Sequence, residues 1–82
     1  MKRKKKVFMK LLEVIRSHVQ DDPDVNLFYF VLKRDFEGVK KAMDAGANPQ
    51  TRDIDIIRKY KTLLEKECPD DLERFLRLVT LI

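Results

Sequence analysis

The chain has 82 residues, of which 44% are hydrophobic and 39% are charged, and its formal net charge is +4. This length allows a single domain, and the hydrophobic share argues against intrinsic disorder. The one cysteine excludes a disulfide framework and a cysteine-based zinc site, and no apolar run reaches the roughly 18 residues of a membrane span. Two glycines are too few for a phosphate-binding loop.

The positive charge is concentrated at the N-terminal end. Residues 1–20 carry seven basic side chains and one acidic one, whereas residues 21–82 carry eleven basic and thirteen acidic ones. Such an asymmetry is typical of a contact with nucleic acid or with an acidic lipid surface. The candidate anion-binding residues are Lys2, Arg3, Lys4, Lys5 and Lys6. The alternative is a solvated N-terminus that only increases solubility.

A basic start followed by apolar residues is also found in secretory signal peptides. Here Lys10 and Glu13 interrupt the apolar segment, and no small-residue cleavage site follows. We therefore expect a cytoplasmic protein, and the lone Cys68 is typical of a reducing compartment.

Apolar residues at steps of three and four predict five helices joined by short links. The first helix is expected over residues 4–20. Its apolar stripe comprises Phe8, Leu11, Leu12, Ile15 and Val19. The second helix, over 23–33, is apolar almost all round, which is typical of a helix packed between neighbours. Asp22 is expected to cap its start, with Pro23 in its first turn.

Three more helices follow. The third is expected over 36–45, with Asp35 as its N-cap and Gly46 in a left-handed conformation after its end. A polar loop then leads to a fourth helix over 54–67 and to a fifth over 69–81. Residues expected to face inward are Phe36, Val39, Ala42 and Met43 on the third helix, Ile56, Ile57, Tyr60, Leu63 and Leu64 on the fourth, and Leu72, Phe75, Leu76 and Val79 on the fifth. No strand is expected.

An internal repeat of 33 residues relates the two halves of residues 22–82. Shifting the second and third helices by this number of positions places them on the fourth and fifth. The matched pairs are Asp22 with Asp55, Leu27 with Tyr60, Phe30 with Leu63, Val31 with Leu64, Val39 with Leu72, Ala42 with Phe75 and Met43 with Leu76. Apart from the two aspartates, every matched pair is hydrophobic.

This period is that of ankyrin repeats, which are built on pairs of antiparallel helices. Residues 34–49 resemble the second half of an ankyrin repeat. The residues that match the family pattern, in its order, are Glu37, Val39, Lys40, Ala45, Gly46, Ala47 and Asn48. The Thr-Pro-Leu-His start of the family's first helix is absent, and Arg34 stands where the turn between the helices usually has glycine.

The resemblance implies an all-α fold of two stacked ankyrin-like helix-turn-helix units with an N-terminal capping helix. The expected parts of this single domain, 1–82, are a basic capping helix over 1–21, an ankyrin-like repeat over 22–54 and a degenerate terminal repeat over 55–82. An ankyrin unit cannot bury its apolar face alone, and about three units are normally required. The first helix is therefore expected to replace the third layer and to cover Phe28 and Phe30.

The resemblance also implies a non-catalytic protein-protein interaction module, a small regulator or adaptor, because ankyrin-repeat proteins bind partners through loop tips and inner helix faces. Carried onto this chain, the candidate partner-binding residues are Gln50, Thr51, Arg52, Asp53, Asp55, Leu32 and Lys33. The alternative is a small helical nucleic-acid-binding protein that uses the basic N-terminus, and its binding would weaken steeply with added salt. We expect no enzyme activity, cofactor, metal or small-molecule substrate.

Several polar residues have simpler structural explanations than chemistry. His18 has no partner in the sequence that indicates acid–base catalysis. Asp53 and Asp55 supply too few oxygen ligands for a cation, and capping of a helix explains one of them. Cys68 is expected to be a partly buried, inert thiol because acidic residues surround it in the sequence.

The C-terminal residues 78–82 are apolar except for Thr80. We expect a homodimer contact through the apolar C-terminal helix, with a place in the core as the second alternative. The last three residues are also similar to the C-terminal ligands of PDZ domains, which is the third alternative.

Overall fold

The computed structural model describes the backbone of residues 2–80 and the side chains of residues 5–79. This part of the chain contains six helices and no strand, which confirms the predicted all-α class. In chain order the helices are α1 (Lys2–His18), α2 (Pro23–Lys33), α3 (Phe36–Asp44), α4 (Asp53–Lys59), α5 (Lys61–Glu67) and α6 (Pro69–Thr80).

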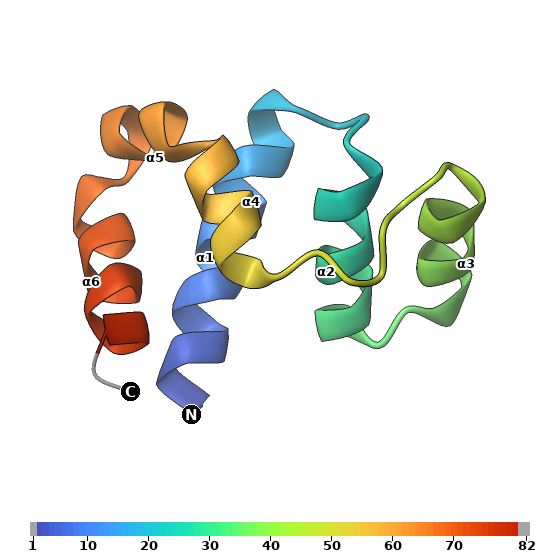
Figure 1. Ribbon diagram of the computed structural model, residues 1–82, viewed down its shortest axis with the longest axis horizontal. Coiled ribbons are helices and arrows are strands. Elements are labelled where there is room, and N and C mark those ends of the chain that lie inside the picture. Colours follow the sequence, from blue (N-terminus) through green and yellow to red (C-terminus); the bar gives the residue numbers. More distant parts are fainter. Residues whose placement is uncertain (1, 81–82) are drawn as a thin grey trace.

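Helix α1 lies in the middle of the molecule (Figure 1). It packs against α2 on one side and against α5 and α6 on the other, while α3 packs chiefly against α2 at the edge. The first helix was predicted to cap one end of a stack, but it lies between the other helices. Direct stacking of two ankyrin-like units is not confirmed. The physical reason is the width of its apolar face, because Val7 lies beside Leu78 of α6 and Met9 lies beside Leu32 of α2.

The main core forms where α1 meets its neighbours. Leu12 and Ile15 are fully buried, and Phe8 is almost completely buried. The ring of Phe8 lies edge-to-face with Phe28, 5.4 Å between centroids, and stacks on Phe75 at 5.5 Å. These contacts join α1 to both α2 and α6, and they cover Phe28 as the sequence predicts. Each fully buried leucine or isoleucine contributes about 1.5–3 kcal/mol to folding, so α1 is central to stability.

Helices α2 and α3 form an antiparallel pair with a small core of its own. Leu27, Ala42 and Ala47 are buried together there. The ring of Phe30 lies so close to the backbone of Gly38 that a β-carbon at this glycine would overlap the ring. The absence of a side chain at Gly38 and the short side chain of Ala42 therefore allow α3 to approach α2 closely.

The predicted helix ends are confirmed at three positions. Asp22 accepts hydrogen bonds from two backbone amides at the start of α2, and Asp35 accepts one at the start of α3. Gly46 has a φ of 99°, which is the left-handed region that favours glycine. In the turn between α2 and α3, Arg34 adopts φ 58°, at the position where the ankyrin family usually has glycine.

The predicted fourth helix, residues 54–67, is in fact two helices, α4 and α5, that meet at Tyr60. The backbone of Tyr60 has φ −108° and ψ 22°, outside the usual helical values. Lys59 Nζ lies 2.8 Å from Asp22 Oδ2, and the Tyr60 hydroxyl donates to the same oxygen. Adjacent residues of a continuous helix point about 100° apart, so the break allows both side chains to reach one carboxylate.

Two residues that were predicted to face inward are exposed. Phe36 is 81% exposed and Met43 is 42% exposed. Val31 is 52% exposed, although its partner in the repeat, Leu64, is fully buried. The reason is that α3 has its main contact with α2 on the Gly38 side, and no other described helix packs over the side that carries Phe36 and Met43.

Candidate functional site

The predicted partner-binding loop borders a polar depression of about 380 Å³ that the loop forms with the start of α2 and with α4. Its lining residues are Asp22, Asp24, Asn48, Gln50, Thr51, Asp55, Ile56 and Lys59. Three predicted residues, Gln50, Thr51 and Asp55, are thus brought together here. Arg52 is exposed beside them, and Asp53 is half-buried at the first position of α4.

Hydrogen bonds hold this loop in a defined shape. Asp24 Oδ1 accepts from the Asn48 amide at 2.7 Å, and Asn48 Oδ1 accepts from the Gln50 amide at 3.0 Å. Asp55 Oδ2 accepts from the Arg52 amide at 3.0 Å, which is half of a capping box for α4. The loop therefore presents its exposed side chains from a fixed backbone, as a binding loop requires.

A buried carboxylate, Asp22, lies at the floor of the depression. Burial by itself would raise the pKa of Asp22, but hydrogen bonds from Lys59, Tyr60 and the Val25 amide outweigh burial and lower the pKa below 3.8. The hydrogen bond with Asp22 raises the pKa of Lys59, and burial, followed by Asp22, raises the pKa of Tyr60. This ionised cluster fastens the link between α1 and α2 to the junction of α4 and α5.

The other two predicted partner-binding residues do not line this depression. Leu32 is half-buried and lines a shallow depression with Lys5, Lys6 and Met9 of α1. Lys33 is exposed, and its Nζ lies 5.6 Å from the centroid of the Tyr29 ring. The structure therefore divides the predicted partner surface between the loop and the C-terminal end of α2.

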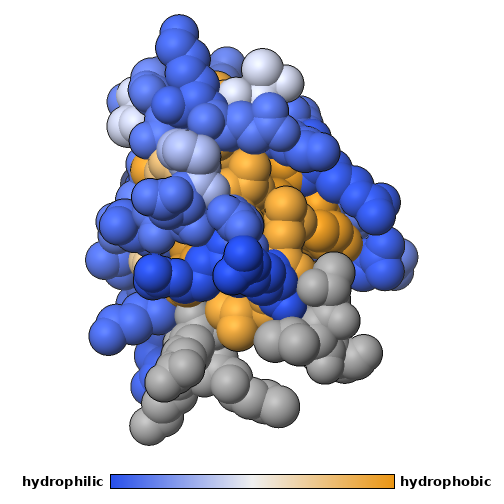
Figure 2. Space-filling model, turned by 90° about the vertical axis from the view of Figure 1, so that its left-hand side faces the viewer, coloured by the Kyte–Doolittle hydropathy of each residue, from blue (hydrophilic) through white to orange (hydrophobic). Residues whose placement is uncertain are grey.

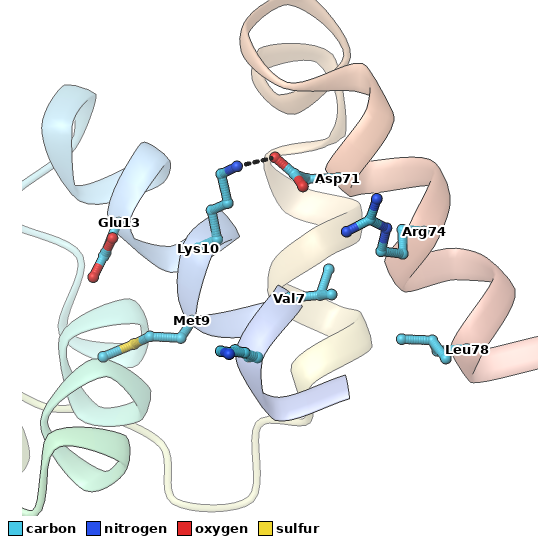
Figure 3. A pocket seen from close by; sticks show the side chains of 8 residues that line it. Val7, Met9, Lys10, Glu13, Asp71, Arg74 and Leu78 are labelled. Carbon is cyan, nitrogen blue, oxygen red and sulfur yellow. Dashed lines mark ion pairs between the residues drawn. The ribbon is translucent and has the colours of Figure 1, made fainter. Parts of the chain in front are cut away.

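The basic N-terminal residues belong to α1, which begins at Lys2. Lys5 and Lys6 are exposed, while the side chains of Lys2, Arg3 and Lys4 lie outside the described residues. Beside Lys6, a groove of about 800 Å³ runs between α1 and α6 (Figure 3). We call it the α1–α6 groove. Its lining residues are Lys6, Val7, Met9, Lys10, Glu13, Asp71, Arg74 and Leu78.

One apolar surface was missed by the sequence interpretation. Phe36, Val39 and Met43 follow one another at steps of three and four on α3, so they share one side of that helix. Val39 packs against the small core that contains Leu27, and Val31 lies one helical turn after Leu27 on α2. The surface formed by Val31, Phe36, Val39 and Met43, which we call the α2–α3 face, therefore continues this core outward.

A sequence signal for the α2–α3 face exists in the size of the residues on α3. Gly38 and Ala42 are four positions apart and have the smallest side chains on the helix, as a close helix contact requires. Phe36 and Met43 lie on a different side of the helix from these two small residues. An interpretation based on residue size, in addition to hydropathy, would have placed Phe36 and Met43 outside.

The C-terminal helix also has an apolar band. Figure 2 shows apolar surface framed by hydrophilic side chains on the side of the molecule formed by α6. Leu76, Leu78 and Val79 of α6 are partly buried and pack against the main core. Leu81 and Ile82, which the homodimer prediction also involves, lie outside the described residues.

The remaining polar candidates have structural partners. His18 Nε2 lies 2.6 Å from Glu67 Oε1, which ties the end of α1 to the end of α5. Cys68 is half-buried, and burial, followed by the charge of Asp71, raises the pKa of its thiol, as expected for an unreactive cysteine. Among the described residues, no three His, Cys, Asp or Glu side chains are grouped as metal ligands. None of the described helices has the length and apolar character needed to cross a membrane.

Comparisons with protein-family models, with curated proteins and with solved structures found no match to this chain. The relationship to ankyrin repeats therefore stays a prediction based on residues 34–49.

Proposed function

We propose that this chain is a non-catalytic protein-protein interaction module, a small regulator or adaptor. The observation that carries the proposal is the α2–α3 face, where Phe36 is 81% exposed, Val31 52% and Met43 42%. Exposure of large apolar side chains to water is unfavourable, and groups of them on a surface often mark interfaces. Phenylalanine and methionine are enriched where proteins bind each other.

Two further features support a protein partner. The segment that resembles an ankyrin repeat, residues 34–49, contains most of the α2–α3 face, and members of that family bind proteins. The ordered loop with Gln50 and Arg52 adds exposed polar groups on a fixed backbone. Interfaces commonly combine an apolar centre with such a polar rim. The free thiol of Cys68 supports the proposal of a cytoplasmic protein.

The test compares proteins that the immobilised chain retains from an extract of its source cells. We expect at least one protein that the wild type retains and that the double variant F36E/M43E loses, because charges in an apolar interface prevent its desolvation. The matched control is T62E/S17E, which adds two negative charges at exposed positions outside the α2–α3 face and should retain the partner.

A second double variant, K33E/R52E, tests the surface predicted from the family. Loss of the partner by K33E/R52E alone would move the interface to the loop and the end of α2. An unchanged set of retained proteins with both double variants would contradict the proposal for these surfaces.

The second candidate function is binding of nucleic acid by the basic N-terminus. It is favoured by the exposed Lys5 and Lys6 on a helix that begins at Lys2. Binding of this kind weakens steeply with salt because it releases counterions, whereas an apolar interface is much less sensitive. Titration of a fluorescent single-stranded DNA at low and at physiological salt distinguishes the two functions. Loss of all binding at physiological salt would exclude the nucleic-acid function.

A further inference from the structure

We propose that the α1–α6 groove binds an acidic amphipathic helix of a partner protein. This is a second surface, separate from the α2–α3 face, and it does not depend on the function proposed for that face. The groove has an apolar floor and a cationic rim, and it runs along two neighbouring helices.

The floor of the groove is apolar. Val7 points from α1 toward α6, and Leu78 points from α6 toward α1, while Met9 lies on the other flank of α1 (Figure 3). Methionine adapts its shape to different partners, and Met9 and Leu78 are only partly buried. An amphipathic helix would bury its own leucines against Val7 and Leu78, which is the usual way in which a helix binds a groove.

The rim of the groove carries more positive than negative charge. Its cations are Lys6, Lys10 and Arg74, and its anions are Glu13 and Asp71. Asp71 Oδ2 lies 3.1 Å from Lys10 Nζ, so that anion is already neutralised by Lys10 (Figure 3). Among the described residues, neither Lys6 nor Arg74 forms an ion pair.

Once this ion pair is set aside, the groove keeps two cations, Lys6 of α1 and Arg74 of α6, and one anion, Glu13. Exposed Lys5 adds a further positive charge near the same end. Carboxylates of a bound helix would thus meet one cation from each of the two helices. This charge complementarity selects an acidic helix and would repel a basic one.

The lining of the groove favours a protein segment over a nucleic acid. Proteins that bind single strands stack bases on aromatic side chains, and no aromatic residue is among the residues that line the groove. Val7, Met9 and Leu78 would gain little from a phosphate backbone, whereas apolar side chains of a helix would be removed from water against them.

The test uses a defined probe, a fluorescein-labelled peptide of about 16 residues of Leu, Ala and Glu with leucines at steps of three and four. Its binding to the whole chain is followed by fluorescence anisotropy. We expect saturable binding, and the double variant K6E/R74E should weaken it by about tenfold or more because two attractive charges become repulsive. The control K66E/R58E makes the same change in net charge at exposed positions of α5 and α4, and should bind within about twofold of the wild type.

Three further arms make the outcome decisive. A scrambled peptide of the same composition should bind weakly, because its leucines do not form one stripe. The variant F36E should bind the probe normally, which separates this groove from the α2–α3 face. Equal binding of the scrambled peptide, or unchanged affinity of K6E/R74E, would overturn the proposal. The proposal would also be overturned if vesicles that contain phosphatidylserine, or single-stranded DNA, bound more tightly than the peptide and K6E/R74E lost that binding.

Discussion

The contact between Phe30 and Gly38 shows how one missing side chain sets the position of α3. On helix propensity alone, Gly38→Ala would stabilise α3 by about 1 kcal/mol. Here the added β-carbon would overlap the ring of Phe30, and overpacking of this kind costs about 1–3 kcal/mol. We therefore expect Gly38→Ala to lower the free energy of unfolding by a net of up to about 2 kcal/mol in urea denaturation.

A chain that carries Phe30→Leu shows whether overlap with the Phe30 ring, or some other effect, causes the cost of Gly38→Ala. In a chain that already carries Phe30→Leu, the smaller side chain leaves room for the β-carbon, so Gly38→Ala should cost less or should stabilise the chain. An equal cost in both backgrounds would show that Phe30 is not the cause.

The carboxylate of Asp22 predicts a stability that depends on pH. Its pKa is lower in the folded chain than 3.8, so its contribution is present above that value and is lost as pH falls through the folded pKa. Asp22→Asn keeps a good N-cap for α2 but removes the charge that Lys59 and Tyr60 bind. We expect Asp22→Asn to cost about 1–3 kcal/mol at pH 7 and progressively less toward pH ~2.

The exposed neighbour Asp21 gives the control for this pH dependence. Asp21→Asn changes the net charge equally and should leave the unfolding free energy within about 0.5 kcal/mol of the wild type at each pH. If Asp21→Asn and Asp22→Asn had the same pH profile, net charge would explain the effect and the buried cluster would not.

At the scale of elements, the sequence predicted what local chemistry determines. Asp22 and Asp35 accept hydrogen bonds from backbone amides at the starts of two helices, and Gly46 adopts the left-handed conformation after the end of another. All three predictions are confirmed. The break at Tyr60 was not predictable from a helical stripe, because it depends on Asp22, which is 38 residues away in the chain. The exposure of Phe36 likewise depends on which helices cover α3.

The central position of α1 makes a direct prediction about stability. Leu12 is fully buried between helices that are distant in sequence, and a leucine-to-alanine change in such a site costs about 2–5 kcal/mol. We expect Leu12→Ala to lower the unfolding free energy within this range, whereas Val31→Ala, at a half-exposed site, should cost less than about 1 kcal/mol. The sequence likewise predicts that α1 supplies a missing layer of the fold, and equal small effects would contradict that role.

At the scale of the whole molecule, the candidate surfaces differ in how far sequence could predict them. Gln50, Thr51 and Asp55 lie together because they are close in sequence, so a family pattern was enough to group them. The α1–α6 groove joins Lys6 to Arg74, which are almost a chain length apart. No periodicity within one helix contains that information, because it arises only when α6 packs beside α1.

The size of the molecular surface leads to the last prediction. A compact monomer of 9.8 kDa is expected to expose about 5,200 Å², whereas this chain exposes 5995 Å². The shape is flat, 33 × 25 × 18 Å, with α3 at one edge of the molecule and α6 at the other. A standard interface buries roughly 800 Å² on each partner.

We therefore expect self-association through the apolar band of α6, with a solution mass of about 20 kDa by light scattering at both low and high salt. Apolar contacts persist at high salt, whereas a contact made by the basic N-terminus would dissociate. Val79→Asp should give a monomer with unchanged helix content by circular dichroism, and Phe36→Glu should leave the dimer intact. A wild-type monomer at both salts would exclude the dimer and leave Leu78, which the apolar band shares with the α1–α6 groove, open to another protein.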